Sequence, residues 1–175
     1  RALHESKTLQ AMASQLNTPL GELDRKIESI LVQQKQQEKE LRLLREKQAS
    51  GTANQLKQTA INIPASGDLA ECPLILANLG EVEGNTIQTT GDALKSGFDG
   101  VIVLVGKSGD SAVLLAITSK EWQKAYPAGK IIQTLAPLVD GRGGGKPAFA
   151  RGGGKAPGNL EDLIKQAPAL IANLS

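Results

Sequence analysis

Aromatic residues are scarce in this 175-residue sequence, which contains two Phe, one Trp and one Tyr. Proteins that bind single-stranded nucleic acid generally stack successive bases on several aromatic side chains. The aromatic residues here (Phe98, Trp122, Tyr126 and Phe149) are too few to build such a platform. If the chain binds nucleic acid, we therefore expect it to contact the backbone and to recognise shape.

Cysteine and histidine each occur only once, as Cys72 and His4. A single cysteine excludes disulfide bonds within the chain, and the two residues cannot supply the ligands of a structural zinc site. We expect Cys72 to be a small core residue at the start of a strand. The sequence therefore predicts neither a metal site nor a catalytic centre in this chain.

Long apolar runs are also lacking, since no stretch approaches the roughly 18 residues that span a membrane, and no signal peptide is visible. We therefore expect a cytoplasmic protein that does not interact with membranes. The sequence starts at Arg1, without Met and within a helical pattern, so we expect it to be part of a longer chain. The net charge of +2 says little about partners, but the segment from Lys120 to Lys155 contains seven basic residues and only two acidic ones.

The most distinctive segment runs from Asp140 to Lys155 and combines glycine with cations. Two glycine triplets, 143–145 and 152–154, enclose a short apolar insert, and basic residues are spaced through the segment: Arg142, Lys146, Arg151 and Lys155. Glycine lets successive N–H groups converge on an anion, and Arg and Lys add positive charge beside them. We interpret residues 141–155 as a folded glycine-rich loop that binds phosphate groups. The alternative is a flexible cationic linker.

Two known nucleotide-binding motifs do not match this chain. The sequence Gly106-Lys107-Ser108 has the ending of a P-loop, but Val101 stands where the first glycine is required. The glycine spacing at 143–148 fits a dinucleotide-binding pattern only loosely, because it follows a helical segment instead of a strand and contains Pro147. We therefore exclude both kinds of nucleotide site.

Residues 1–50 are predicted to form a helical arm. After a first helix, Asn17-Thr18-Pro19 marks a stop that is followed by a new helix start. The second helix is expected to end at 50–52, and it has apolar residues or glutamine at alternating steps of three and four, at positions 20, 23, 27, 30, 34, 37, 41, 44 and 48. Such a coiled-coil-like arm would either form a homodimer or fold back on the first helix, and the glutamines in its middle weaken both options.

Residues 51–175 are predicted to form a small α/β globular domain, which makes the fold class α+β. The β-branched runs at 101–105 and 111–118 should pair as a hairpin whose strands are buried on both faces. The glycine-rich loop would then join two helices that pack on one small sheet. The other expected elements are an edge strand ending at Ile63, a turn at 65–68, a strand at 72–79 and helices at 85–96, 127–139 and 160–174.

Four features follow one another along this domain: a strand pair, a helix containing the sequence Ala-Gly-Lys-Ile-Ile at 128–132, the double glycine block at 141–154 and a final amphipathic helix. In this order they resemble the C-terminal domain of alanyl-tRNA synthetases, also called the DHH-associated domain. The resemblance implies a module that binds tRNA-Ala at its outer corner, or elbow, and links aminoacylation with the editing of mischarged tRNA. It also implies upstream domains that form an alanine-tRNA ligase using ATP, Mg²⁺ and Zn²⁺, whereas this chain by itself would not be an enzyme.

The resemblance and the chemistry of the glycine block lead to one candidate site. Glycine backbone would approach the folded RNA, and the cations would neutralise its phosphates. Phe149 would either anchor the segment in the core or stack on an exposed base. The candidate RNA-binding residues are Arg142, Gly143, Gly144, Gly145, Lys146, Phe149, Arg151, Gly152, Gly153, Gly154 and Lys155.

Three other functions remain open from the sequence. The first is an accessory RNA- or nucleotide-binding domain of a DHH-type phosphoesterase, although such relatives typically have a histidine in the glycine block, where this chain has Lys146 and Arg151. The second is the C-terminal domain of a free-standing alanyl-tRNA editing protein. The third is a structural oligomerisation module, in which the arm dimerises and residues 141–155 only close the fold.

Overall fold

The computed structural model describes residues 2–64, 71–83 and 85–174, with side chains from residue 7 onward. Internal contacts divide the chain into two compact units, Arg1–Leu44 and Arg45–Ser175. The turn expected at 65–68 lies outside the described residues. Within the described part of the chain, no helix is both long and apolar enough to cross a bilayer.

Helices make up the first unit. Helix α1 (Ala2–Gln15) ends before Asn17, whose φ of 49° is left-handed. Asparagine tolerates this conformation better than most residues do, so the stop predicted here is confirmed. The chain then passes through a short 3₁₀ turn, η1 (Leu20–Glu22), into the long helix α2 (Leu23–Gln58).

Helix α2 continues past the end predicted at 50–52, so that prediction is wrong. Glycine in a helix interior costs about 1 kcal/mol, but tertiary packing offsets this locally. Ala49 is buried, and Ala53 is 2% exposed and belongs to a core cluster that includes strand residues. A hydrogen bond also holds the end of the helix, because Nζ of Lys57 donates to the carbonyl oxygen of Ser96 at 2.8 Å.

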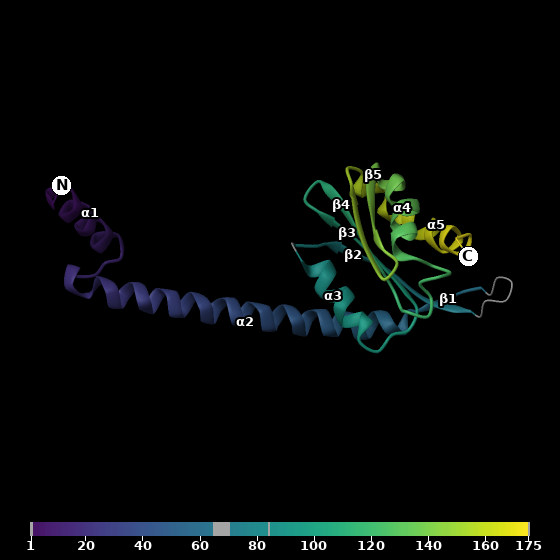
Figure 1. The fold of residues 1–175 in the computed structure, drawn as a ribbon, viewed down its shortest axis with the longest axis horizontal. Helices are drawn as coiled ribbons and strands as arrows, with labels where there is room; N and C mark the ends of the chain where they lie inside the picture. Colours follow the sequence, from purple (N-terminus) through teal and green to yellow (C-terminus); the bar gives the residue numbers. More distant parts are fainter. Residues whose placement is uncertain (1, 65–70, 84, 175) are drawn as a thin grey trace. The chain divides into compact units, whose positions relative to one another are not determined.

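A six-stranded mixed sheet forms the centre of the second unit (Figure 1). Its strand order is β1-β2-β3-β4-β6-β5, and only β2 and β3 are parallel neighbours. Helix α3 (Thr86–Lys95) provides the crossover that this parallel pair requires. The α+β class, the edge strand and the β3–β4 hairpin are thereby confirmed. The strands are β1 (Ile61–Ile63), β2 (Cys72–Glu81), β3 (Val101–Ser108), β4 (Ser111–Thr118), β5 (Gly141–Lys146) and β6 (Phe149–Gly154).

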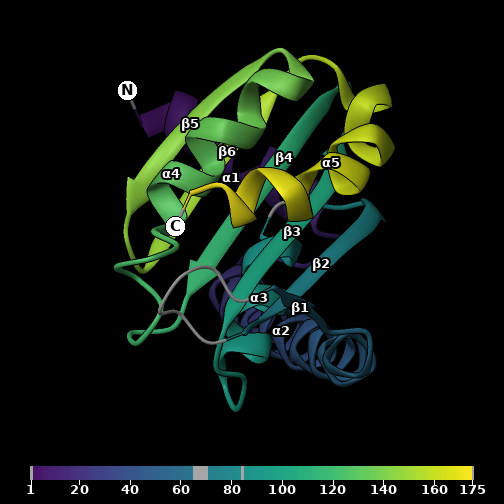
Figure 2. The same ribbon diagram turned by 90° about the vertical axis from the view of Figure 1, so that its right-hand side faces the viewer.

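Helices cover both faces of the sheet (Figure 2), and each face has its own apolar core. Helices α4 (Ala128–Leu135) and α5 (Leu160–Ala172) cover one face, which we call the α4 face. Helix α3 and the end of α2 pack on the other, the α3 face. In strand β3, Val103 lies in the α4-face core, whereas Ile102 and Leu104 lie in the α3-face core. The prediction that this strand is buried on both faces is confirmed.

Cys72 begins β2 and is fully buried, as predicted for a core residue. Burial raises the pKa of its thiol to about 12, because desolvation disfavours the thiolate. The thiol is therefore protonated at neutral pH, and it lacks the thiolate character of a reactive cysteine.

Candidate nucleic-acid interface

The glycine-rich segment forms a β-hairpin at the edge of the sheet, so the predicted loop between two helices is wrong, as is the flexible linker. Strand β5 pairs with β6 from Gly141↔Gly154 to Lys146↔Phe149, and β6 pairs in turn with β4. Glycine has a low intrinsic preference for strands, so the local sequence does not signal this hairpin. Pairing with the apolar strand β4 orders it instead, because the backbone groups of β4 need partners.

A two-residue turn at Pro147 and Ala148 connects the strands and is docked on the domain. The carbonyl oxygen of Pro147 accepts from the amide of Ala128 at the start of α4, at 2.9 Å. The carbonyl oxygen of Ala148 accepts from the amide of Thr118 at 3.1 Å. Phe149, the next residue, is half-buried and packs on the α3-face core. The apolar insert therefore holds the hairpin in place.

Glycine lets helix α4 lie directly on the hairpin. A Cβ atom at Gly143 would lie 2.5 Å from Cγ2 of Ile132, and one at Gly152 would lie 2.8 Å from the same atom. On the helix, a Cβ atom at Gly129 would lie 2.6 Å from the carbonyl oxygen of Gly145. These positions have no room for a side chain. Packing against α4 is sufficient to require glycine here. A sequence signal for this packing role is Gly129, a glycine within an apolar helix.

The opposite side of the hairpin carries cations. Side chains alternate along a strand, and paired residues share a face, so Arg142 and Lys146 of β5 and Arg151 of β6 project away from Gly143 and α4. All three cations are exposed. Nη1 of Arg151 donates to Oε1 of Gln88 on α3 at 3.1 Å, which places Arg151 on the α3 face. We call Arg142, Lys146 and Arg151 the basic face.

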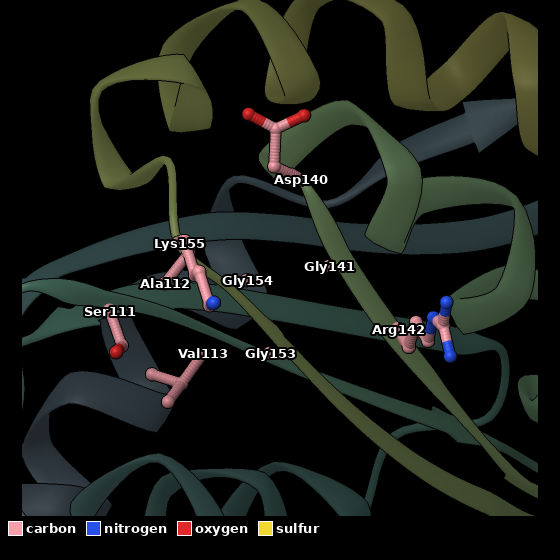
Figure 3. Close-up of a pocket in the computed structure, with 9 residues that line it drawn as sticks. All are labelled: Ser111, Ala112, Val113, Asp140, Gly141, Arg142, Gly153, Gly154 and Lys155. Carbon is pink, nitrogen blue, oxygen red and sulfur yellow. The ribbon is translucent and has the colours of Figure 1, made fainter.

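An open depression of about 630 Å³ lies where β5 begins and β6 ends (Figure 3). Two exposed cations, Arg142 and Lys155, and one carboxylate, Asp140, are among its lining residues. Figure 3 shows Lys155 beside Gly153 and Gly154, whose backbone pairs with β4 and β5. Because the cations outnumber the carboxylate, the depression can accept an anionic group such as a phosphate.

The hairpin distributes the four predicted cations instead of converging them on one point. Arg142 and Lys155 line the same depression, whereas Lys146 lies at the other end of β5, beside the turn. A strand rises about 3.4 Å per residue, so the ends of β5 are roughly 17 Å apart. This spread suits contact with several phosphates along an RNA backbone better than the capture of a single anion.

Comparison with known proteins connects this fold to a family. The model of the DHHA1 domain matches residues 73–173, a range that includes α3, α4, α5 and nearly all of strands β2 to β6. The chain belongs to the DHHA1 domain family. The hairpin and the helix that packs on it both lie within the matched part of this DHHA1 domain.

Curated relatives of this DHHA1 domain are alanine-tRNA ligases. The enzyme of Psychrobacter cryohalolentis is 33% identical over 166 residues, which are 94% of this chain and 18% of the relative. The enzyme of Opitutus terrae is 35% identical over 173 residues, which are 97% of this chain and 18% of the relative. The chain thus spans about a fifth of the length of these relatives.

A solved structure shares the fold. The crystal structure of the C-Ala domain from Aquifex aeolicus alanyl-tRNA synthetase aligns with a TM-score of 0.54 at 24% identity, covering 62% of this chain and 98% of that domain. Together with the family match and the ligase relatives, this confirms the predicted resemblance to the C-terminal domain of alanyl-tRNA synthetases.

Proposed function

We propose that this chain is the C-terminal, tRNA-binding domain of a cytoplasmic alanine-tRNA ligase and that it contacts the elbow of tRNA-Ala. The observation that carries the proposal is the basic face, an exposed set of cations on a hairpin that pairs with the sheet and packs against α4. The ligase activity and the tRNA partner are proposed from the names of the relatives, which are alanine-tRNA ligases. Ligation and editing, with ATP, Mg²⁺ and Zn²⁺, are assigned to domains upstream, and this domain would link them by holding the tRNA.

The cations of the hairpin would bind the RNA backbone and not its bases. A guanidinium such as that of Arg142 can bind two oxygens of one phosphate, whereas Lys155 acts as a point charge. Each phosphate that is neutralised releases condensed counterions, which favours binding at low salt. Such contacts read shape and not sequence, which suits the elbow because its geometry is common to tRNAs. The identity of the tRNA would then be read by the upstream domains.

Removal of the elbow from the RNA is expected to weaken binding about tenfold, or by about 1.4 kcal/mol. The two probes would be folded tRNA-Ala and a minihelix that has the same acceptor stem and T arm but no D arm, so that the contact between the D and T loops is missing. Fluorescence anisotropy at one salt concentration gives both dissociation constants. Equal affinity for the two RNAs would contradict the elbow contact.

The relatives favour a ligase over the two other RNA-related functions. A phosphoesterase accessory domain predicts Asp and His metal-binding motifs upstream of this chain, and a free-standing editing protein predicts an editing domain with no ligase domain before it. Sequencing the gene upstream of the codon for Arg1 distinguishes the three proteins. A ligase domain is the expected result.

We further propose that α2 pairs with α2 of a second copy in antiparallel orientation. Four heptad positions of this helix expose apolar side chains, with Ile27 at 40%, Ile30 at 38%, Leu41 at 49% and Leu44 at 60%. The pattern is symmetric about its centre, so position 27 would face position 44 of the second copy and position 30 would face position 41. The glutamines at 34 and 37 would then face each other, and a polar pair of this kind specifies register and orientation.

Leu41→Glu is expected to convert a dimer into a monomer, because it places a charge in the apolar contact between the two helices. Leu43→Glu is the matched control, since Leu43 is similarly exposed, at 46% against 49% for Leu41, but lies outside the heptad positions. Sedimentation equilibrium at several protein concentrations reports the mass of each. A monomeric wild type, or an equal effect of both substitutions, would rule out this pairing.

A further inference from the structure

Helix α3 contacts the basic face through one hydrogen bond. Nη1 of Arg151 on β6 donates to Oε1 of Gln88 on α3 at 3.1 Å, although the two residues are 63 positions apart in the sequence. Arg151 is exposed, and Gln88 is half-buried. The bond therefore ties a long, charged surface side chain to a helix that is anchored in the core.

The packing of α3 fixes the position of Gln88. Its neighbour Ile87 is 1% exposed and lies in the α3-face core. Gly91, almost one helical turn after Gln88, lets the helix approach the sheet closely, because a Cβ atom there would lie 2.5 Å from Cδ2 of Leu115. Leu115 is also the β4 residue that pairs with Arg151. The same contact with β4 thus places both partners of the hydrogen bond.

Glutamine holds the guanidinium without neutralising it. Oε1 of Gln88 accepts from one of the several N–H donors of Arg151, and among the described residues the other donors remain for a ligand. A carboxylate in the same place would pair with the guanidinium and cancel its charge. These remaining donors are complementary to phosphate oxygens, which only accept hydrogen bonds.

We infer that α3 is part of the RNA-binding surface and that Gln88 is a positioning residue that holds Arg151 in the geometry for binding an RNA phosphate. This inference rests on the proposed tRNA-binding function. Ordering a long side chain at an interface opposes binding. Because the bond to Gln88 orders Arg151 in the protein before RNA binds, part of the loss of side-chain entropy on binding is avoided.

A double-mutant cycle with tRNA tests this role. Arg151→Ala is expected to weaken binding about tenfold and Gln88→Ala about threefold, and the double variant should bind no more weakly than Arg151→Ala, because Gln88 acts through Arg151. Gln133→Ala is the matched control, since Gln133 is an exposed glutamine on α4, which packs on the other face of the same hairpin. This control should bind like the wild type.

Gln88→Glu separates positioning from a purely structural role. It keeps the size of the side chain and the bond to Arg151, but it neutralises the guanidinium. It should therefore lower the slope of log affinity against log salt by about one, whereas a structural role of residue 88 predicts an unchanged slope. Thermal melting followed by circular dichroism verifies that each variant is folded.

The outcomes distinguish this inference from the proposed function. Two results would overturn the positioning role alone. One is that Gln88→Ala binds tRNA as tightly as the wild type. The other is that the losses of affinity in the two single variants multiply in the double variant. A further variant replaces Arg142, Lys146, Arg151 and Lys155 together with alanine. If this variant does not bind while Arg151→Ala binds like the wild type, the inference fails and the proposed function stands. If the wild type does not bind tRNA, both fail.

Discussion

Replacing the four hairpin cations with alanine is expected to remove most of the salt dependence of tRNA binding. The four-cation variant combines substitutions at Arg142, Lys146, Arg151 and Lys155. Four phosphate contacts predict a slope of about 3 to 4 in log affinity against log salt, which is a loss of about 100-fold between 50 and 200 mM salt. All four side chains are exposed, so the free energy of unfolding should change by less than about 1 kcal/mol. Fluorescence anisotropy across a salt series measures the slope for both proteins.

A second four-site variant controls for overall charge. It replaces four exposed lysines outside the hairpin with alanine, so its net charge falls by the same amount: Lys120, Lys124, Lys130 and Lys165. If the hairpin binds the RNA, this control should keep the slope of the wild type to within about one. Equal losses in the two variants would mean that general charge attraction, and not the basic face, holds the RNA.

Alanine at Gly143 is expected to destabilise the second unit by about 3 kcal/mol, whereas alanine at the next position should cost less than about 1 kcal/mol. At Gly143 the new methyl group would lie 2.5 Å from Cγ2 of Ile132 and 2.6 Å from the carbonyl oxygen of Arg151, so packed helix and strand atoms would have to move. At Gly144 the nearest atom is Nε2 of Gln133 at 3.3 Å, at the end of an exposed side chain that can rotate away.

Urea unfolding followed by the fluorescence of Trp122 measures both changes. Trp122 is the single tryptophan of the chain, and it packs on the α4-face core, so its signal reports on the unit that contains the hairpin. A difference of about 3 kcal/mol should also lower the melting temperature by roughly 10 °C. If alanine at Gly144 destabilises as much as alanine at Gly143, the glycines are needed for backbone freedom and not for the approach of α4.

These two experiments address the two sides of one hairpin. On the α4 face, glycine removes side chains so that Ile132 can lie against the strands. On the opposite side, the cations project from the same strands into solvent. A strand separates the two roles because its side chains alternate between faces. A substitution can therefore damage folding without changing the proposed RNA-binding surface, or weaken binding without affecting the fold.

The sequence by itself determined the elements whose signals are local. The apolar β-branched runs of β3 and β4 and the apolar stripe of α4 follow from the periodicity of side chains along each element. The start of α2 after Asn17 follows from the backbone preferences of a few residues. The cations and glycines at 141–155 also stood out as a distinct segment, because composition can be read without knowing the fold.

Only the tertiary structure decided how distant segments meet. Helix α2 extends to Gln58 because Ala53 is buried in the α3-face core, and no local signal reports that contact. The glycine segment is a hairpin because β4 offers it backbone partners, although glycine itself does not favour a strand. The bond between Gln88 and Arg151 joins residues 63 positions apart and depends on where α3 packs. Secondary-structure propensity acts over a few neighbouring residues, whereas side-chain packing and strand pairing depend on the whole folded chain. These features are therefore absent from the local sequence pattern.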